Sequence, residues 1–67
     1  MTVAKVSEIT STSEKSFGDA IQKGIKRASK TLKNITNAWV ADQEVAVDKG
    51  KIVEYRVRLR VTFVLEP

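Results

Sequence analysis

The chain has 67 residues, of which 12 are Lys or Arg and 8 are Asp or Glu, giving a formal charge of +4. It contains neither Cys nor His, which excludes disulfides, thiolate or imidazole metal sites and the commonest general base. A single core of this size is only marginally stable, so we expect one domain over residues 1–67 that is supported by oligomerisation. No pair of residues suggests a nucleophile with its base, and we expect no enzyme.

The N-terminal segment lacks an apolar stretch typical of a signal peptide, and no apolar run is long enough for a membrane span. We therefore expect a soluble, cytoplasmic protein without membrane contact. The basic residues of the central segment are not interleaved with aromatic side chains that could stack on bases, so we expect no nucleic-acid partner either.

The first element is a strand over Val3–Ile9, although its apolar residues do not keep one phase. A run of hydroxyl residues then precedes a helical pattern, and two helix starts are open. Ser13 could be the N-cap, or Ser11 and Glu14 could form a capping box two residues earlier.

The helix is predicted over Glu14–Lys33, because small and apolar residues recur at spacings of three and four. That stripe consists of Phe17, Ala20, Ile21, Gly24, Ile25, Ala28 and Leu32. Gly24 lies inside the stripe, where it costs about 1 kcal/mol against Ala, so it indicates close approach of the helix to a sheet. The opposite side of the helix is basic and solvated.

The second strand is predicted over Asn37–Val47, and its pattern changes phase along its length. Ala38 and Val40 share one face, whereas Val45 and Val47 share the other. Either a β-bulge lies near Asp42 to Glu44, or both faces of the strand are partly buried. The segment Asp48–Lys51 is a hairpin turn in which Gly50 supplies a positive φ.

The last strand, Glu54–Leu65, shows the most regular alternation in the chain. One face is apolar, with Tyr55, Val57, Leu59, Val61, Phe63 and Leu65. The other face carries Arg56, Arg58 and Arg60 in line. At roughly 3.3 Å per residue the strand spans about 40 Å, so it reaches beyond a domain of this size and implies a neighbouring chain.

The element order is β-α-β-β, which predicts an α+β fold with a three-stranded antiparallel sheet wrapped around one helix. In length and element spacing the chain resembles the dodecin family. The matching residues are Thr12-Ser13 followed by Phe17, the alanine-rich helix that ends near Leu32, the second strand and hairpin, and the ending Phe63-Val64-Leu65-Glu66. The resemblance covers nearly the whole chain.

The resemblance implies a hollow homododecamer that acts as a flavin buffer. Many dodecins bind FMN, FAD, riboflavin or lumichrome in pairs, stacked between tryptophans of symmetry-related chains. Here Asn37 stands at the position of the stacking Trp, and the chain's only Trp is Trp39. Arg56 stands where a Gln usually hydrogen-bonds the isoalloxazine edge. Both changes predict weakened flavin binding.

The second strand is similar to that of a dodecin branch that lacks the flavin Trp and is partly associated with calcium. We take Asp42, Glu44 and Asp48 as candidate Ca²⁺ ligands, because Ca²⁺ prefers six to eight oxygen ligands. Three carboxylates would need water, backbone carbonyls or another subunit to complete the site. The alternative is a flavin-free assembly that binds Ca²⁺ or other ions, or one that is purely structural.

The candidate cofactor-binding residues are Asn37, Trp39, Gln43, Arg56 and Arg58. If Val47 opposes Ile52, then Trp39 opposes Arg60 and lies on the arginine side; a loop one residue shorter sends it to the core. The arginines either hold an anionic ligand or pair with carboxylates of Asp42, Glu44, Glu54 and Glu66 from the same or a neighbouring chain.

Overall fold

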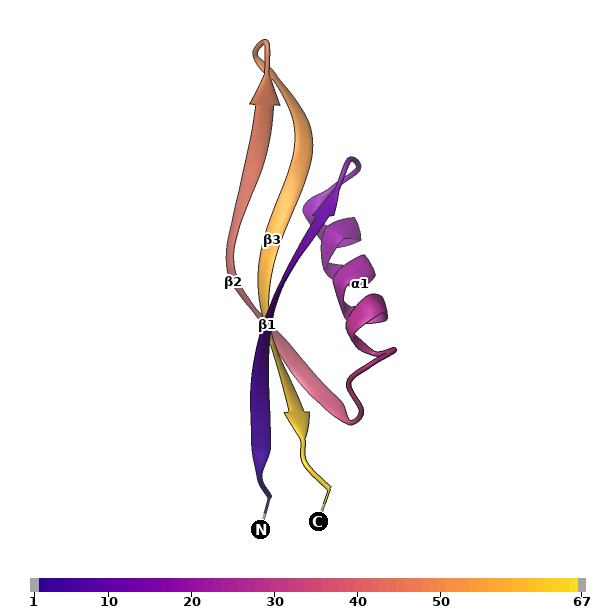
Figure 1. Ribbon diagram of the computed structural model, residues 1–67. Coiled ribbons are helices and arrows are strands. Elements are labelled where there is room, and N and C mark those ends of the chain that lie inside the picture. The colour runs from indigo at the N-terminus through magenta and orange to yellow at the C-terminus, as the bar shows by residue number, and fades with distance from the viewer. Residues whose placement is uncertain (1, 67) are drawn as a thin grey trace.

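A computed structural model describes residues 2–66 of the chain, which form three strands and one helix. The elements are β1 (Ala4–Ser13), α1 (Phe17–Ala28), β2 (Ile35–Asp48) and β3 (Lys51–Val64). The sheet is antiparallel in the order β1-β3-β2, and α1 packs on one face of it (Figure 1). The expected β-α-β-β fold is thereby confirmed.

The alternation of β3 determines where the core lies. Val57, Leu59 and Val61 are at most 1% exposed and face α1 together with the half-buried Tyr55 and Phe63. Because β3 is the central strand, both neighbours pair along it and contribute the same face to the core. Leu65, which we expected on the apolar face, lies beyond the end of β3 and is exposed.

The hairpin of β2 and β3 closes with a two-residue turn at Lys49-Gly50, where φ is +51° and +77°. Positive φ at both positions is typical of a type I′ turn, which matches the twist of the flanking strands. The turn is shorter than the expected four residues because Asp48 already pairs with Lys51. The predicted pairing of Val47 with Ile52 is confirmed.

Two β-bulges of the hairpin offset its middle section by one residue. Val53 has no partner on β2, and Ala41 has none on β3, so the register shifts and then returns for Asn37 to Val40; a third irregularity lies between Ile35 and Asn37. The second bulge lies one residue before the Asp42–Glu44 stretch where we expected it. Because a bulge inverts the facing of the residues beyond it, Val45 joins Ala38 and Val40 on the face toward α1.

The helix begins later than predicted. Strand β1 runs on to Ser13, so the hydroxyl run continues the sheet, and the N-cap is Ser16, whose Oγ accepts from the backbone N–H of Asp19 at 3.0 Å. Ser13 Oγ instead accepts from the backbone N–H of Lys15 and donates to the Asp19 carboxylate at 2.6 Å. That hydrogen bond and the neighbouring Lys23 lower the pKa of Asp19 below its ordinary value.

The helix also ends earlier than the predicted Lys33. After Ala28 the chain forms tighter turns, and the hydroxyls of Ser29 and Thr31 donate to the carbonyls of Ile25 and Ala28. Such bonds compete with the helical ladder and explain the early end. The apolar stripe is confirmed: Ala20, Gly24 and Ala28 are buried against the sheet.

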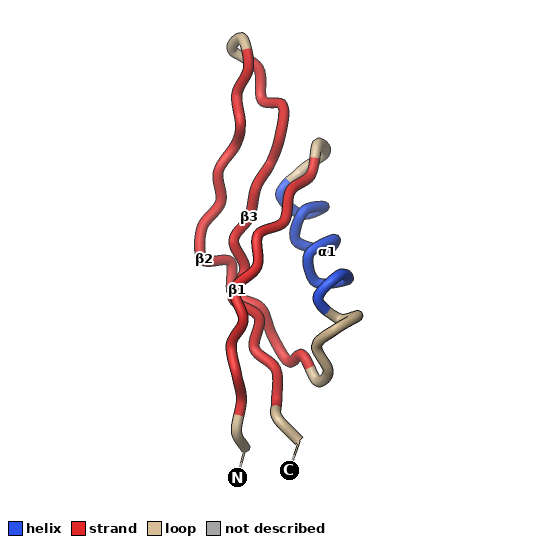
Figure 2. The backbone as a smooth tube through the Cα atoms, in the orientation of Figure 1, coloured by secondary structure: helices blue, strands red, loops and turns tan. Residues whose placement is uncertain are grey.

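The molecule is strongly elongated, with extents of 52 × 19 × 13 Å (Figure 2). Its Cα radius of gyration is 13.8 Å, whereas a compact chain of this length would have about 11 Å. The β2–β3 hairpin extends past α1 and exposes apolar side chains, among them Val47 at 61% and Ile52 at 52%. Within residues 2–66, no helix is long and apolar enough to cross a membrane.

Gly24 should tolerate no side chain, in contrast to Gly18. A Cβ at Gly24 would lie 3.0 Å from Ser11 Cβ and 3.1 Å from Leu59 Cδ1, whereas a Cβ at Gly18 would meet only Ser16 Oγ at 3.9 Å. Overpacking costs about 1–3 kcal/mol, which offsets or exceeds the helix-propensity gain of about 1 kcal/mol. We expect Gly24→Ala to lower the urea midpoint and Gly18→Ala to leave it unchanged or raise it. Equal stabilisation by both substitutions would contradict this close packing.

Candidate functional site

The face of the sheet that points away from α1 carries most of the candidate site residues. We call it the arginine face. Its polar and aromatic residues are Glu8, Thr10 and Thr12 of β1, Asn37, Trp39, Asp42 and Glu44 of β2, and Glu54, Arg56, Arg58, Arg60 and Thr62 of β3. Directly opposed residues of antiparallel strands project to the same side, and the pairing with the β3 arginines therefore assigns this face.

Each arginine of β3 is paired with a carboxylate. Arg58 Nη1 donates to both oxygens of Asp42, at 2.7 and 2.9 Å. Arg60 Nε donates to Glu8 across the sheet at 3.2 Å. Arg56 Nε donates to Glu54 on its own strand, with Glu44 at 3.9 Å. The alternative of ion pairing is therefore realised within one chain.

Two details of these ion pairs differ from the pairing expected from the sequence. Glu66 accepts a hydrogen bond from Asn34 Nδ2 at 2.7 Å and does not pair with an arginine of β3. Glu8 was not among the expected partners, because only the pairing of β1 with β3 places it opposite Arg60. The Asp42 hydrogen bond, aided by the charge of that carboxylate, raises the pKa of Arg58 above its ordinary value.

Trp39 lies on the arginine face, as expected from the pairing of Val47 with Ile52, although the turn itself is shorter than expected. It opposes Arg60, whose guanidinium carbon lies 5.3 Å from the centre of the indole ring, within cation–π range. The side chain is nevertheless 63% exposed. Asn37 opposes Thr62 on the same face, about 7 Å away along the strand. An exposed aromatic ring beside a cation is a surface on which a planar ligand can stack.

Gln43 is separated from the other candidate residues. It pairs with Val57, and both lie on the side of the sheet toward α1. The bulge at Ala41 causes this, because in an unbroken strand Gln43 would share the face of Trp39. The same bulge brings Asp42 and Glu44 to the arginines. The arginine face thus carries Asn37, Trp39, Arg56 and Arg58 but not Gln43, and Arg56 lies about 20 Å along β3 from Thr62, the partner of Asn37.

The candidate metal ligands do not meet within one chain. Asp42 and Glu44 are neighbours on the arginine face, but Asp48 lies at the hairpin end opposite Lys51. Four residues of strand separate it from Glu44 by about 13 Å. Within residues 2–66, no three carboxylates are grouped closely enough to hold a metal ion. A Ca²⁺ site would need further oxygen ligands from another copy or from water.

The sequence matches the Dodecin family over residues 3–66. The chain belongs to the dodecin family. A dodecin from Thermus thermophilus, solved as a point mutant, is 34% identical, covers all of both chains and superposes with a TM-score of 0.94. The dodecin from Streptomyces davaonensis is 32% identical with a TM-score of 0.93, covering 98% of this chain and 97% of its own. Small-ligand binding of the dodecin type is accordingly its function.

One curated relative is named for an ion. Calcium dodecin from Mycobacterium tuberculosis is 36% identical over 67 residues, which cover all of this chain and 94% of that protein. Its crystal structure, that of a calcium-chelating antigen with a calcium-binding site, is 39% identical and superposes with a TM-score of 0.83. That comparison covers 97% of this chain and 93% of the relative.

Proposed function

We propose that this dodecin assembles as a hollow homododecamer and binds a small aromatic ligand on its arginine face, with flavin bound only weakly. It acts by binding and storage, without catalysis. The observation that carries this proposal is the position of Trp39, which is 63% exposed on the same face as Asn37 and beside the β3 arginines.

The need for partner chains follows from how little the monomer buries. Among residues 2–66, the core cluster contains only Ala20, Val57, Leu59 and Val61 as buried residues. One helix of 12 residues covers part of one sheet face, while the arginine face and the hairpin end are uncovered. Exposed apolar side chains on such surfaces are typical of interfaces. A closed assembly would bury them.

Weak flavin affinity follows from three features of the arginine face. Asn37 offers no ring where the family's stacking Trp is expected, and Trp39 is displaced by about 7 Å. Arg56 supplies donors only, so the N3–H of an isoalloxazine would find no acceptor there. In addition, Arg56 and Arg58 already donate to carboxylates of their own chain, which reduces their attraction for the phosphates of FMN or FAD.

A second candidate function is Ca²⁺ binding, favoured by the similarity to calcium dodecin. Asp42 and Glu44 would supply oxygens from one chain, and Asp48 could join them only from a neighbouring copy. Binding would compete with Arg58 and Arg56 for these carboxylates. Such a site would therefore depend on the assembly.

Assembly can be tested with light scattering at micromolar concentration. We expect a single large species and no stable 7.5 kDa chain. Val47→Asp should shift the mass distribution toward smaller species, because it replaces an exposed apolar side chain of the hairpin with a charged one. Lys49→Asp, two residues away in the turn, is the matched control and should leave the assembly intact. A stable wild-type monomer would contradict the proposed architecture.

Flavin binding can be tested by titrating riboflavin and FMN while following flavin fluorescence. We expect dissociation constants in the micromolar range or weaker, since an aromatic stack contributes about 0.5–1.5 kcal/mol beyond its buried area. Asn37→Trp combined with Arg56→Gln should strengthen binding, and Trp39→Ala should abolish what remains. Nanomolar quenching by the unmodified protein would show that Trp39 forms a full stack and that weak binding is wrong.

Calcium binding can be tested through the melting temperature. Chelation should lower it and Ca²⁺ should restore it, since saturation to 100 times the dissociation constant stabilises by about 2.7 kcal/mol. Mg²⁺ should do less, because it requires a tighter octahedral geometry. Asp42→Asn should remove the Ca²⁺ effect. If neither chelator nor Ca²⁺ shifts the melting temperature of the wild type, the carboxylates do not bind Ca²⁺ and act only as ion-pair partners of the arginines.

A further inference from the structure

The charge of the chain is unevenly distributed. Residues 14–33 contain six basic residues and two acidic ones, whereas the rest of the chain contains six of each. The whole net charge of +4 therefore belongs to the helical segment. The formal charges outside this segment cancel, so the excess positive charge that attracts an anion belongs to the helical segment.

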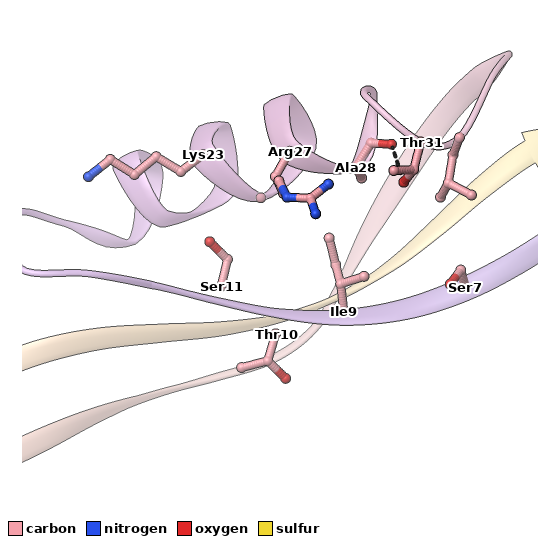
Figure 3. A pocket seen from close by; sticks show the side chains of 10 residues that line it. Ser7, Ile9, Thr10, Ser11, Lys23, Arg27, Ala28 and Thr31 are labelled. Atoms are coloured by element: carbon pink, nitrogen blue, oxygen red, sulfur yellow. Dashed lines mark hydrogen bonds between the residues drawn. The ribbon is translucent and has the colours of Figure 1, made fainter.

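A groove of about 400 Å³ lies between α1 and β1 on this basic side. Its lining combines hydroxyl groups, apolar surface and cations: Ser7, Ile9, Thr10, Ser11, Lys23, Gly24, Arg27, Ala28, Thr31 and Leu32. Figure 3 shows the hydroxyl of Ser11 and the side chain of Ile9 directed from β1 toward α1. No carboxylate lines the groove, so its chemistry does not suit a metal cation.

Arg27 is the lining residue whose cationic group points into the groove. Figure 3 shows its guanidinium extending from α1 into the space above Ile9. Among residues 2–66, no carboxylate lies within 4 Å of it. Lys23 differs: its side chain points away along the helix and its Nζ is 3.1 Å from Asp19. The donors of Arg27 are thus directed at the groove without an internal acceptor.

The remaining lining determines what kind of anion fits. Ile9, Ala28 and Leu32 provide an apolar wall, and Ser11 and Ser7 of β1 lie on either side of Ile9, about 13 Å apart along the strand. A guanidinium suits carboxylate and phosphate groups alike, and hydroxyls add further donors. The groove lacks aromatic side chains, so it offers no stacking surface for a nucleobase or a flavin ring.

We propose that this groove binds a small amphipathic anion, a carboxylate or phosphate with a short aliphatic tail. Arg27 holds the anionic group, the hydroxyl of Ser11 donates to it, and the tail lies against Ile9 and Leu32. The site is on the opposite side of the sheet from the arginine face. The proposal is independent of flavin or Ca²⁺ binding there.

Calorimetric titration of the assembled protein at fixed ionic strength tests the proposal. The probes are hexanoate and hexyl phosphate, with propionate and inorganic phosphate as their short counterparts. Both long probes should bind about tenfold or more tightly than the short ones, because additional methylenes are buried. Whichever of the two long probes binds more tightly shows whether the groove prefers a carboxylate or a phosphate. Binding independent of tail length would overturn the amphipathic assignment.

Two variants assign the anionic group to Arg27. Arg27→Gln should weaken the long probes about tenfold or more, since a charge-assisted hydrogen bond is lost. Lys26→Gln is the matched control: it removes the same charge from the adjacent residue, which does not line the groove, and should change affinity less than twofold. If both variants lowered the affinity for the long probes equally, the loss would reflect the overall charge of the helix, and the proposed site would be refuted. So would loss of assembly in Arg27→Gln alone, since it would place Arg27 between copies.

Discussion

The structure depends on the central strand β3 and on its strict alternation. Both other strands pair with it, so its apolar residues Val57, Leu59 and Val61 define the core face and its arginines define the opposite face. The strand is 14 residues long, whereas the helix that covers it has 12 residues and only about half the rise per residue. A sheet so much longer than its helix remains largely open, and the elongated shape and exposed valines of the hairpin follow from this mismatch.

The same strand lies between two sides of the molecule that differ in charge. On the arginine face, carboxylates from all three strands surround Arg56, Arg58 and Arg60, and the opposite charges cancel. Exposed ion pairs of this kind contribute little to stability. One of the three guanidinium groups, that of Arg60, also lies over the ring of Trp39. The helical side has no such balance. A ligand that relies on stacking suits the first side, and one that relies on charge suits the second.

Much of the fold could be predicted from the sequence, because the patterns of β3 and of the helical stripe are set by residues close together in the chain. The helix start could not: Ser11, Thr12 and Ser13 suit a cap and a strand equally, and only pairing with Val57, Arg56 and Tyr55 decides between them. The candidate site was predicted in part. Trp39 was placed correctly because the bulges at Val53 and Ala41 cancel, whereas Gln43 was misplaced because it lies between them. The groove at Arg27 joins two separate elements and leaves no local signal.

The paired bulges have a consequence for how related sequences are compared. They offset residues 42–46 of β2 by one position without changing the length of the chain, and residues 37–40 pair in the same register as Val47. A relative with its bulge one residue further along would align without a gap and yet present a different side chain outward at that point of the strand. Equivalent columns of an alignment then hold residues on opposite sides of the sheet. Ligand preference in this architecture can therefore diverge by the migration of a bulge, with no substitution at the residues that touch the ligand.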